Sequence, residues 1–290
     1  MSRRGWILFG AMCVLWGIPY LMIRVAVREI SPATLVFLRT STAALVLLPL
    51  AAYRGELRRL LPSWRPLLAF TIIEIAIPWL ALSSAERRVT SSVAALLLAA
   101  VPFVAVAIAA MTRSERMDAR RLTGLLVGIA GVAAIVGFDL AHLSAVGLVE
   151  MLVVAVCYAV GPWILSRYLS DLPGLGVIAA SLGLTAAAYA PVAAFQLPAS
   201  FPSDKAIASV AGLALACTAL AFVLFFELIA EAGAVRATVI TYVNPAVAAL
   251  LGVAVLSERF TLAMGIGFVL VLAGSVIATS ASRQRAVAEA

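Results

Sequence analysis

The sequence predicts an all-α polytopic membrane protein of ten transmembrane helices, arranged as two inverted repeats of five helices. Composition is the first observation: 64% of the 290 residues are hydrophobic and only 12% are charged. Soluble domains are about 45–50% apolar and about 25% charged. The second observation is an internal repeat with a constant offset. Together they indicate a chain that folds in a bilayer from two copies of one unit.

The repeat is clearest around two prolines, Pro102 and Pro245, which lie 143 residues apart. The same offset relates the triplet that ends in Glu115-Arg116 to the triplet that ends in Glu258-Arg259. It also relates Gly124 to Gly267, Gly131 to Gly274, Pro19 to Pro162 and Arg24 to Arg167. One ungapped offset indicates duplication. We therefore predict a first repeat over 1–143 and a second repeat over 144–290.

Ten continuous apolar runs match the length of about 20 residues that a membrane-spanning helix needs. The predicted spans are 6–27, 33–52, 66–85, 91–111, 121–138, 145–166, 174–195, 206–228, 236–256 and 262–281. Continuous runs favour helices over barrel strands, which alternate with a period of two. Because each half has an odd number of spans, the second half crosses the membrane in the opposite orientation. Inverted repeats of this kind are typical of secondary transporters.

The distribution of basic residues predicts the orientation. With the N-terminus inside, the predicted inner segments hold 14 of the 21 lysines and arginines and the outer segments hold 6. By the positive-inside rule, both termini are then cytoplasmic. The net charge of +7 is explained by this topology, so no nucleic-acid partner is expected.

These features resemble the drug/metabolite transporter superfamily, specifically its EamA type. The resemblance rests on the duplicated proline, glutamate and glycine positions above, with Trp16-Gly17 and Pro32…Arg39 in the first half, and covers nearly the whole chain. The second half has no counterpart of Trp16-Gly17 or of Arg39.

The resemblance implies a multi-pass exporter in the bacterial cytoplasmic membrane that works by alternating access through a central cavity. Size and aromatic content are similar to those of the bacterial amino-acid exporters of this family, so amino acids are the expected small amphiphilic substrates. Other solutes, such as drugs, nucleosides or sugars, and uncoupled facilitation remain alternatives.

Four prolines within spans are candidates for helix kinks and gating: Pro19, Pro102, Pro162 and Pro245. A proline removes one helical hydrogen bond and frees the carbonyl group four residues before it. In lipid that carbonyl needs a partner, so such sites face a cavity or another helix. We expect the four kinks to surround a cavity; the alternative is that they only adjust packing.

Polar and aromatic residues within spans are the candidates for the substrate site. They are Trp16, Tyr20, Arg39, Glu74, Trp79, Tyr158, Trp163, Thr241, Tyr242 and Asn244. An aromatic face can hold an ammonium group with about 0.5–2 kcal/mol. A charge at mid-bilayer costs about 2.5–3.5 kcal/mol and usually faces protein or water. Arg39 and Glu74 can pair, or Glu74 can bind a cationic group or a proton; packing, interfacial anchoring and a structural role for Arg39 are the alternatives.

Glu115 and Glu258 are predicted structural residues of the repeat. Each lies at the C-terminal end of a helix, where the helix dipole disfavours an anion, so each needs donors, such as those at the start of the next helix. Glycine stripes on the fifth and tenth spans predict close helix contact, within the bundle or in a dimer. The chain can therefore be a monomer or a homodimer.

Enzyme chemistry is not expected. The single histidine, His142, lies in a predicted outer connection, and the sequence has no His-Glu-x-x-His motif or ATP-binding motif. The three cysteines lie within apolar runs without metal-ligand spacing. We therefore predict no catalytic residue, no metal and no cofactor; the expected partners are a small-molecule substrate and the lipid bilayer.

Overall fold

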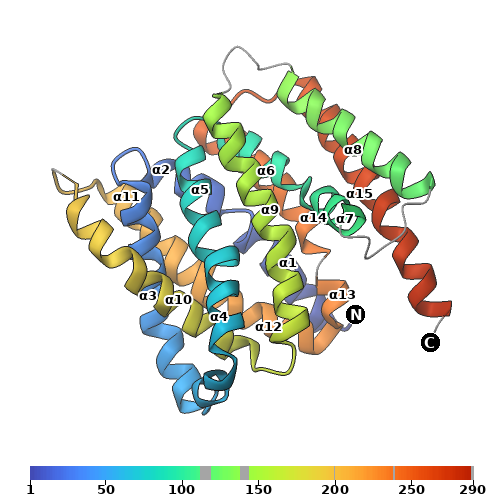
Figure 1. Ribbon diagram of the computed structural model, residues 1–290. Coiled ribbons are helices and arrows are strands. Elements are labelled where there is room, and N and C mark those ends of the chain that lie inside the picture. The colour runs from blue at the N-terminus through green and yellow to red at the C-terminus, as the bar shows by residue number, and fades with distance from the viewer. Residues whose placement is uncertain (112–118, 138–143, 199, 238, 289–290) are drawn as a thin grey trace.

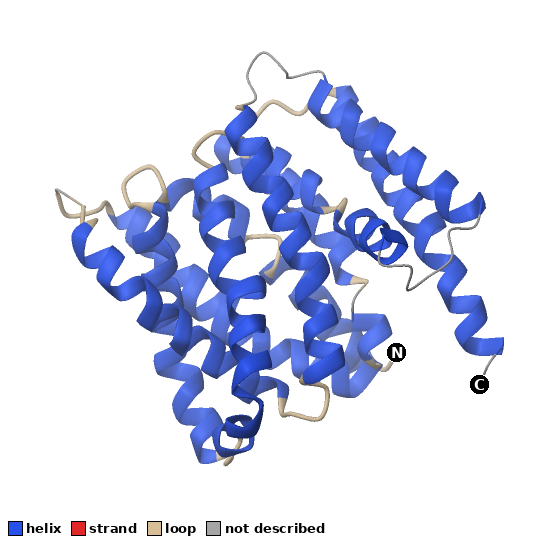
Figure 2. Cartoon of the chain, viewed as in Figure 1, coloured by secondary structure: helices blue, strands red, loops and turns tan. Residues whose placement is uncertain are grey.

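The computed structural model describes residues 1–111, 119–137, 144–198, 200–237 and 239–288, and within these it consists of helices without strands (Figures 1 and 2). Glu115 and His142 lie outside the described residues. The α-helices are α1 Arg3–Leu15, α2 Pro19–Ala26, α3 Pro32–Tyr53, α4 Trp64–Phe70, α5 Ile77–Ala85, α6 Ser91–Leu98, α7 Val101–Met111, α8 Ala119–Gly137, α9 Ala145–Tyr168, α10 Gly174–Phe195, α11 Asp204–Ala211, α12 Ala221–Ala232, α13 Ala234–Ala237, α14 Ile240–Leu256 and α15 Leu262–Ala288. A 3₁₀ segment, η1 Leu57–Ser63, and two π-helical segments, η2 Thr71–Ala76 and η3 Gly212–Leu220, complete the list.

These elements form membrane spans. In the described part of the chain, 8 helical segments are long and apolar enough to cross a bilayer, and two shorter apolar helices are Ile240–Leu256 and Leu262–Ala278. The prediction of an all-α polytopic membrane protein is confirmed. Both chain ends lie at one side of the bundle, which we call the termini side, and the other is the far side (Figure 1).

Hydroxyl caps determine where four helices begin at the far side. The side chains of Ser31, Thr90, Ser144 and Ser203 each accept a hydrogen bond from the amide three residues later. A cap of this kind satisfies one of the amides that a helix start leaves without an intrahelical partner. The chain can therefore turn back into lipid at the starts of α3, α6, α9 and α11.

Four predicted spans contain a proline that is a candidate kink. Two of these spans are interrupted next to the proline, and the other two are continuous helices. The first span is interrupted at 16–18, and α2 begins at Pro19. The fourth is interrupted at 99–100, directly before α7, in which Pro102 is the second residue. Proline is favoured in a first turn because the missing amide has no helical partner there. Pro162 and Pro245 lie inside the continuous helices α9 and α14.

The two halves pack against each other element by element. The helix pairs α8 with α15, α3 with α10 and α6 with α14 each join corresponding spans of the two halves. The first span (α1, α2) packs on the eighth (α12, α11), and the third (α5) packs on the sixth (α9). This is the set of contacts expected when two five-helix units are related by a two-fold axis.

Glycines allow α8 and α15 to touch backbone to backbone at one edge of the bundle (Figure 1). A Cβ on Gly131 would lie 2.7 Å from the carbonyl oxygen of Gly267, and one on Gly124 would lie 2.8 Å from that of Gly274. Small residues allow this approach between helices in lipid, where packing rather than hydrophobicity drives association. The predicted glycine stripes therefore meet each other within one chain.

Substitution at this contact provides a stability test. In Gly131→Ala the new methyl group overlaps the backbone of α15, and such overpacking costs about 1–3 kcal/mol. We expect a lower thermal unfolding midpoint in detergent. Gly10→Ala is the control, because no described atom lies within 4 Å of a Cβ at Gly10. This helix position should instead gain about 0.5–1 kcal/mol. Equal midpoints for the two variants would contradict the close contact.

Candidate functional site

A buried arginine lies between the two halves. Arg39 is two turns into α3, and its side chain is 8% exposed. Its guanidinium carbon lies 3.7 Å from the centre of the Trp79 ring, and its Nε donates to the Thr218 hydroxyl at 2.9 Å. Trp79 belongs to the first half and Thr218 to the second, so the cation is held from both sides.

The two π-helical segments flank this arginine. The 143-residue offset moves 71–76 onto 214–219, which lies inside η3. In η2, the Ile77 amide bonds to the Ile72 carbonyl five residues back. In η3, the Thr218 hydroxyl donates to the Leu213 carbonyl, also five residues back, at 2.7 Å. π-Helical turns of this type occur frequently at functional sites.

Pro78 gives a physical reason for the first of these segments. It has no amide hydrogen, so the carbonyl of Glu74 four residues earlier cannot form its helical bond. The second segment has Ala221 at the matching position and therefore has no such cause in its sequence.

Two tyrosines complete the surroundings of Arg39. Tyr20, in α2 directly after the interruption of the first span, is buried. Tyr158 of α9 is partly buried and packs against two separate hydrophobic clusters. Both lie near Arg39. The Trp79 side chain lies beside the Tyr158 hydroxyl. A tyrosine hydroxyl can both donate and accept a hydrogen bond.

Glu74 lies beside this cluster without pairing with Arg39 in the described residues. Its carboxylate fills the space where a Cβ on Gly161 would otherwise lie, one residue before Pro162. Its Oε2 is buried and has no hydrogen-bond partner among the described side chains and backbone groups. A buried carboxylate oxygen without a partner is costly, which is typical of functional positions in a membrane protein.

At the far side, Glu258 binds the start of α6. It accepts hydrogen bonds from the amides and hydroxyls of Ser91 and Ser92 at distances between 2.6 and 3.0 Å. Gly252 leaves room for this contact, and Ser257 reverses the chain with a positive φ of 56°. The donors thus lie at the start of the fourth span, across the two halves, and not at the start of the next helix as the sequence suggested.

Glu86 lies close to Glu258 and was not predicted as a site residue. It follows α5 and is 0% exposed. The Arg24 guanidinium donates to the backbone carbonyls of Glu86 and Val89, so it ties α2 to the turn between α5 and α6. Neither carboxylate oxygen of Glu86 has a hydrogen-bond partner in the described part of the chain.

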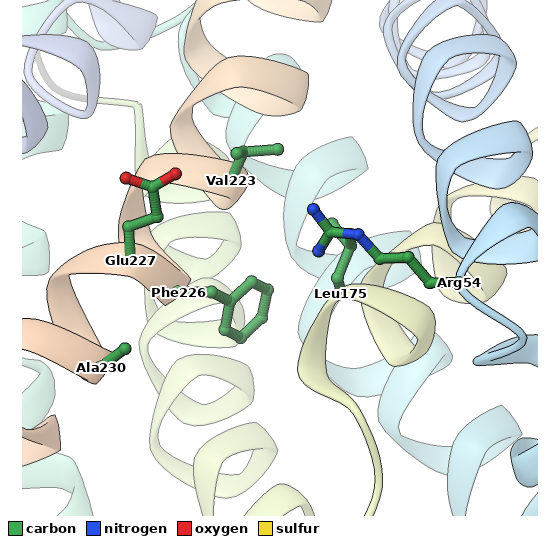
Figure 3. A pocket seen from close by; sticks show the side chains of 6 residues that line it. All are labelled: Arg54, Leu175, Val223, Phe226, Glu227 and Ala230. Atoms are coloured by element: carbon green, nitrogen blue, oxygen red, sulfur yellow. The ribbon is translucent and has the colours of Figure 1, made fainter.

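The termini side carries a cavity of about 220 Å³ (Figure 3). Its lining consists of Arg54, Leu175, Val223, Phe226, Glu227 and Ala230. Arg54 from the end of α3 and Glu227 from α12 lie on opposite sides of it, with the Phe226 ring between them (Figure 3). Glu227 also pairs with Arg4 at 2.8 Å, which ties α1 to α12. The cavity therefore offers one cation, one anion and an apolar wall.

The structure brings together Tyr20, Arg39, Trp79 and Tyr158, with Glu74 beside them. Other predicted site residues lie elsewhere. The centre of the Trp16 ring lies 4.8 Å from that of Phe225, with the two rings tilted, in the hydrophobic cluster that contains residues of α1 and α12. Trp163 is 57% exposed on the outer surface of α9, where its ring lies 5.9 Å from that of Tyr168.

The three predicted residues of the ninth span belong to α14. Tyr242 accepts a hydrogen bond from Ser275 of α15 at 3.4 Å, Thr241 is exposed and Asn244 is half-buried. These three remain sequence predictions, as does the structural role of Glu115.

Fold and site together describe a multi-pass membrane transporter with a polar cluster at the interface of two halves. The EamA-like transporter family matches the chain twice, over residues 3–137 and 145–280, and the chain belongs to this family. The inner membrane transporter YedA of Escherichia coli K12, named as uncharacterized, is 28% identical over 278 residues, covering 89% of this chain and 87% of the relative. An uncharacterized transporter of Archaeoglobus fulgidus is 23% identical over 98% of this chain and 100% of its own.

A solved crystal structure has the same fold. It superposes with a TM-score of 0.68, covers 98% of this chain and 99% of its own, and is 22% identical in sequence. At this identity the likeness concerns the fold alone.

The cap by Glu258 can be tested with a pair of glutamates at the far side. Glu258→Gln loses the charge and replaces one acceptor by a donor that faces the α6 amides. We expect a loss on the order of 2–3 kcal/mol, seen as a lower thermal midpoint. Glu150→Gln removes only a partly exposed salt bridge to Arg88, at 3.1 Å, and should cost less than about 1 kcal/mol. A larger loss for Glu150→Gln than for Glu258→Gln would argue against the cap.

Proposed function

We propose that the protein exports small amphiphilic metabolites, amino acids first among them, across the bacterial cytoplasmic membrane by alternating access. The substrate site of this proposal is the cluster of Tyr20, Arg39, Trp79 and Tyr158, with Glu74 beside it. Both termini face the cytoplasm in this proposal, as the basic residues of the termini-side connections favour.

The buried guanidinium of Arg39 is the observation that carries the proposal. Guanidinium groups match the planar geometry of carboxylates and bind them through two parallel hydrogen bonds. The Nε is committed to Thr218, whereas the cation otherwise rests on the aromatic face of Trp79. A solute carboxylate that enters from the cavity between Arg54 and Glu227 can replace the weaker contact of the Arg39 guanidinium with the Trp79 ring. The Tyr158 hydroxyl supplies a second donor to the same solute.

The remaining groups favour a zwitterion over a simple anion. Glu74 provides a carboxylate that can receive an ammonium group, and the surrounding apolar side chains suit a hydrophobic substituent. At the termini side, the cavity between Arg54 and Glu227 presents the same combination of charges with an apolar wall. A solute with both charges therefore finds matching partners in the cavity and in the cluster.

Alternating access is supported by how the two halves are joined. Polar ties exist at both sides of the bundle: Arg4 with Glu227 at the termini side, and Glu258 with the start of α6 at the far side. The interrupted spans at 16–18 and 99–100 and the two π segments lie between these ties. Such breaks in regular helix are the places where a span can bend without losing its hydrogen bonds elsewhere.

Transport by reconstituted protein tests the role of Arg39. Proteoliposomes are supplied with a neutral amino acid, its decarboxylated amine and its deaminated acid. We expect Arg39→Gln to lower kcat/KM by at least about tenfold, roughly 1.4 kcal/mol, for the two solutes with a carboxylate. The amine should be affected much less. Equal loss for all three solutes, or no loss, would contradict carboxylate binding by Arg39.

The control is Arg28→Gln, an exposed arginine at the far side that should leave all three fluxes unchanged. Drugs, nucleosides and sugars belong in the same screen, because preference for one of these over amino acids would replace the substrate class proposed here. Accumulation against a solute gradient distinguishes a coupled exporter from a facilitator.

A pair of tryptophans tests the location of the site. Trp79→Ala removes the surface on which the guanidinium rests, and should reduce amino-acid flux by at least about tenfold. Trp163→Ala changes a side chain at the outer surface of α9, and its flux should stay within about twofold of the original. The reverse order of effects would place the solute path on the other face of α9.

A further inference from the structure

Glu86 is the buried acidic group that the proposed substrate site does not use. It is 0% exposed, and neither of its carboxylate oxygens has a hydrogen-bond partner in the described part of the chain. An ionised carboxylate in such surroundings is strongly disfavoured, whereas a neutral carboxyl group is tolerated far better.

The charged neighbours of Glu86 are committed to other partners. Arg24 donates to the backbone carbonyls of Glu86 and Val89, and Arg39 donates to Thr218. Glu258 adds negative charge nearby, and its own carboxylate is satisfied by Ser91 and Ser92. The titratable and charged groups around Glu86 are Tyr20 and Arg24 of α2, Arg39 of α3, Glu258 after α14, and the Arg88–Glu150 pair outside the same turn.

The carboxyl groups of Glu86 and Glu258 lie in different environments. Glu258 accepts four hydrogen bonds at the start of α6, whereas neither carboxylate oxygen of Glu86 accepts one in the described part of the chain. Burial raises the pKa of Glu86 well above its usual range, and the Glu258 charge acts in the same direction, while Arg24 and Arg39 act against it. When the environments of two neighbouring carboxyl groups differ in this way, the group with the raised pKa is the one that carries a proton. Here that group is Glu86.

We propose that Glu86 is a proton-binding site that opens and closes with the far side of the transporter. While the far side is closed, the carboxyl group is neutral. When Glu258 and the start of α6 separate and water enters, the O–H bond breaks, the proton passes to water, and a solvated carboxylate remains. Closing reverses the step with uptake of one proton. This proposal rests on the proposed alternating access, and it adds a proton that is bound and released during the transport cycle.

The sign of the pH effect follows from this assignment. The closed state binds the proton more tightly than the open state, so acid favours the closed far side. Raising the pH through the titration of the closed state shifts the equilibrium towards the open far side. The shift is at most about tenfold per pH unit for one proton.

Infrared difference spectroscopy tests proton binding without any solute. The purified protein in lipid is compared between about pH 5 and about pH 9. We expect the band of a protonated carboxyl group to fade with rising pH in the unmodified protein. That component should be absent from Glu86→Gln and retained in Glu74→Gln, which changes the half-buried glutamate beside the Arg39 cluster. A Glu86→Gln spectrum identical to that of the unmodified protein would overturn the proposal.

Stability provides a second, independent readout. Glu86→Gln and Glu86→Leu replace a group that is already neutral in the closed state, so their thermal midpoints near neutral pH should equal or exceed the original. Removing one member of a buried ion pair would instead lower the thermal midpoint by roughly 10 °C. A loss of that size in both variants would show that Glu86 is ionised and paired, against the proposal.

Transport then links the proton to function. The flux of the unmodified protein should vary with pH at the far side, whereas that of Glu86→Gln should vary less than about twofold over the same range. An unchanged pH profile in Glu86→Gln would contradict the coupling. If no amino acid is transported at all, the substrate proposal fails, and the infrared and stability results still decide whether Glu86 binds the proton.

Discussion

A guanidinium group within a bilayer has to be surrounded by protein. Inserting it costs about 2.5–3.5 kcal/mol unless partners compensate. Arg39 finds them in both halves of the chain, the Trp79 ring in one and the Thr218 hydroxyl in the other. The π segments place both partners, because η2 directly precedes the helix that carries Trp79 and η3 contains Thr218. The charge therefore requires the two repeats to be packed together before the site exists.

The features that depend on local composition and spacing could be predicted from the sequence. Apolar runs predicted the spans, and the constant offset predicted which spans correspond. Arg39 is a candidate because a charge within a span usually faces protein or water, and Trp79 is one because an aromatic face within a span can hold a cation. Glu86 escaped prediction because it follows the end of a span, and the sequence does not show that Arg24 of α2 and Glu258 after α14 lie close to this turn. Thr218 is one hydroxyl in an apolar run, and nothing in the sequence marks the π segment around it.

The sequence also does not show which face of each helix is buried in the bundle and which lies on the outer surface. Tyr20 and Trp163 occupy equivalent positions under the 143-residue offset, yet Tyr20 is buried near Arg39 and Trp163 lies on the outer surface. In the same way Arg39 corresponds to Leu182, and Glu74 to Cys217. What the halves share is backbone geometry: the π segments, the glycine contact and the pairing of spans. The two charged residues of the site, Arg39 and Glu74, have no charged counterpart in the second half, so one symmetric scaffold carries one asymmetric site.

In the proposed mechanism, Arg39 receives the carboxylate of the transported solute. A structure of the protein in lipid with a saturating neutral amino acid tests this role. We expect the solute carboxylate within hydrogen-bonding distance of the Arg39 guanidinium, with the solute beside Trp79 and Tyr158. A solute bound only between Arg54 and Glu227, or on the outer face of α9, with Arg39 still resting on Trp79, would contradict it.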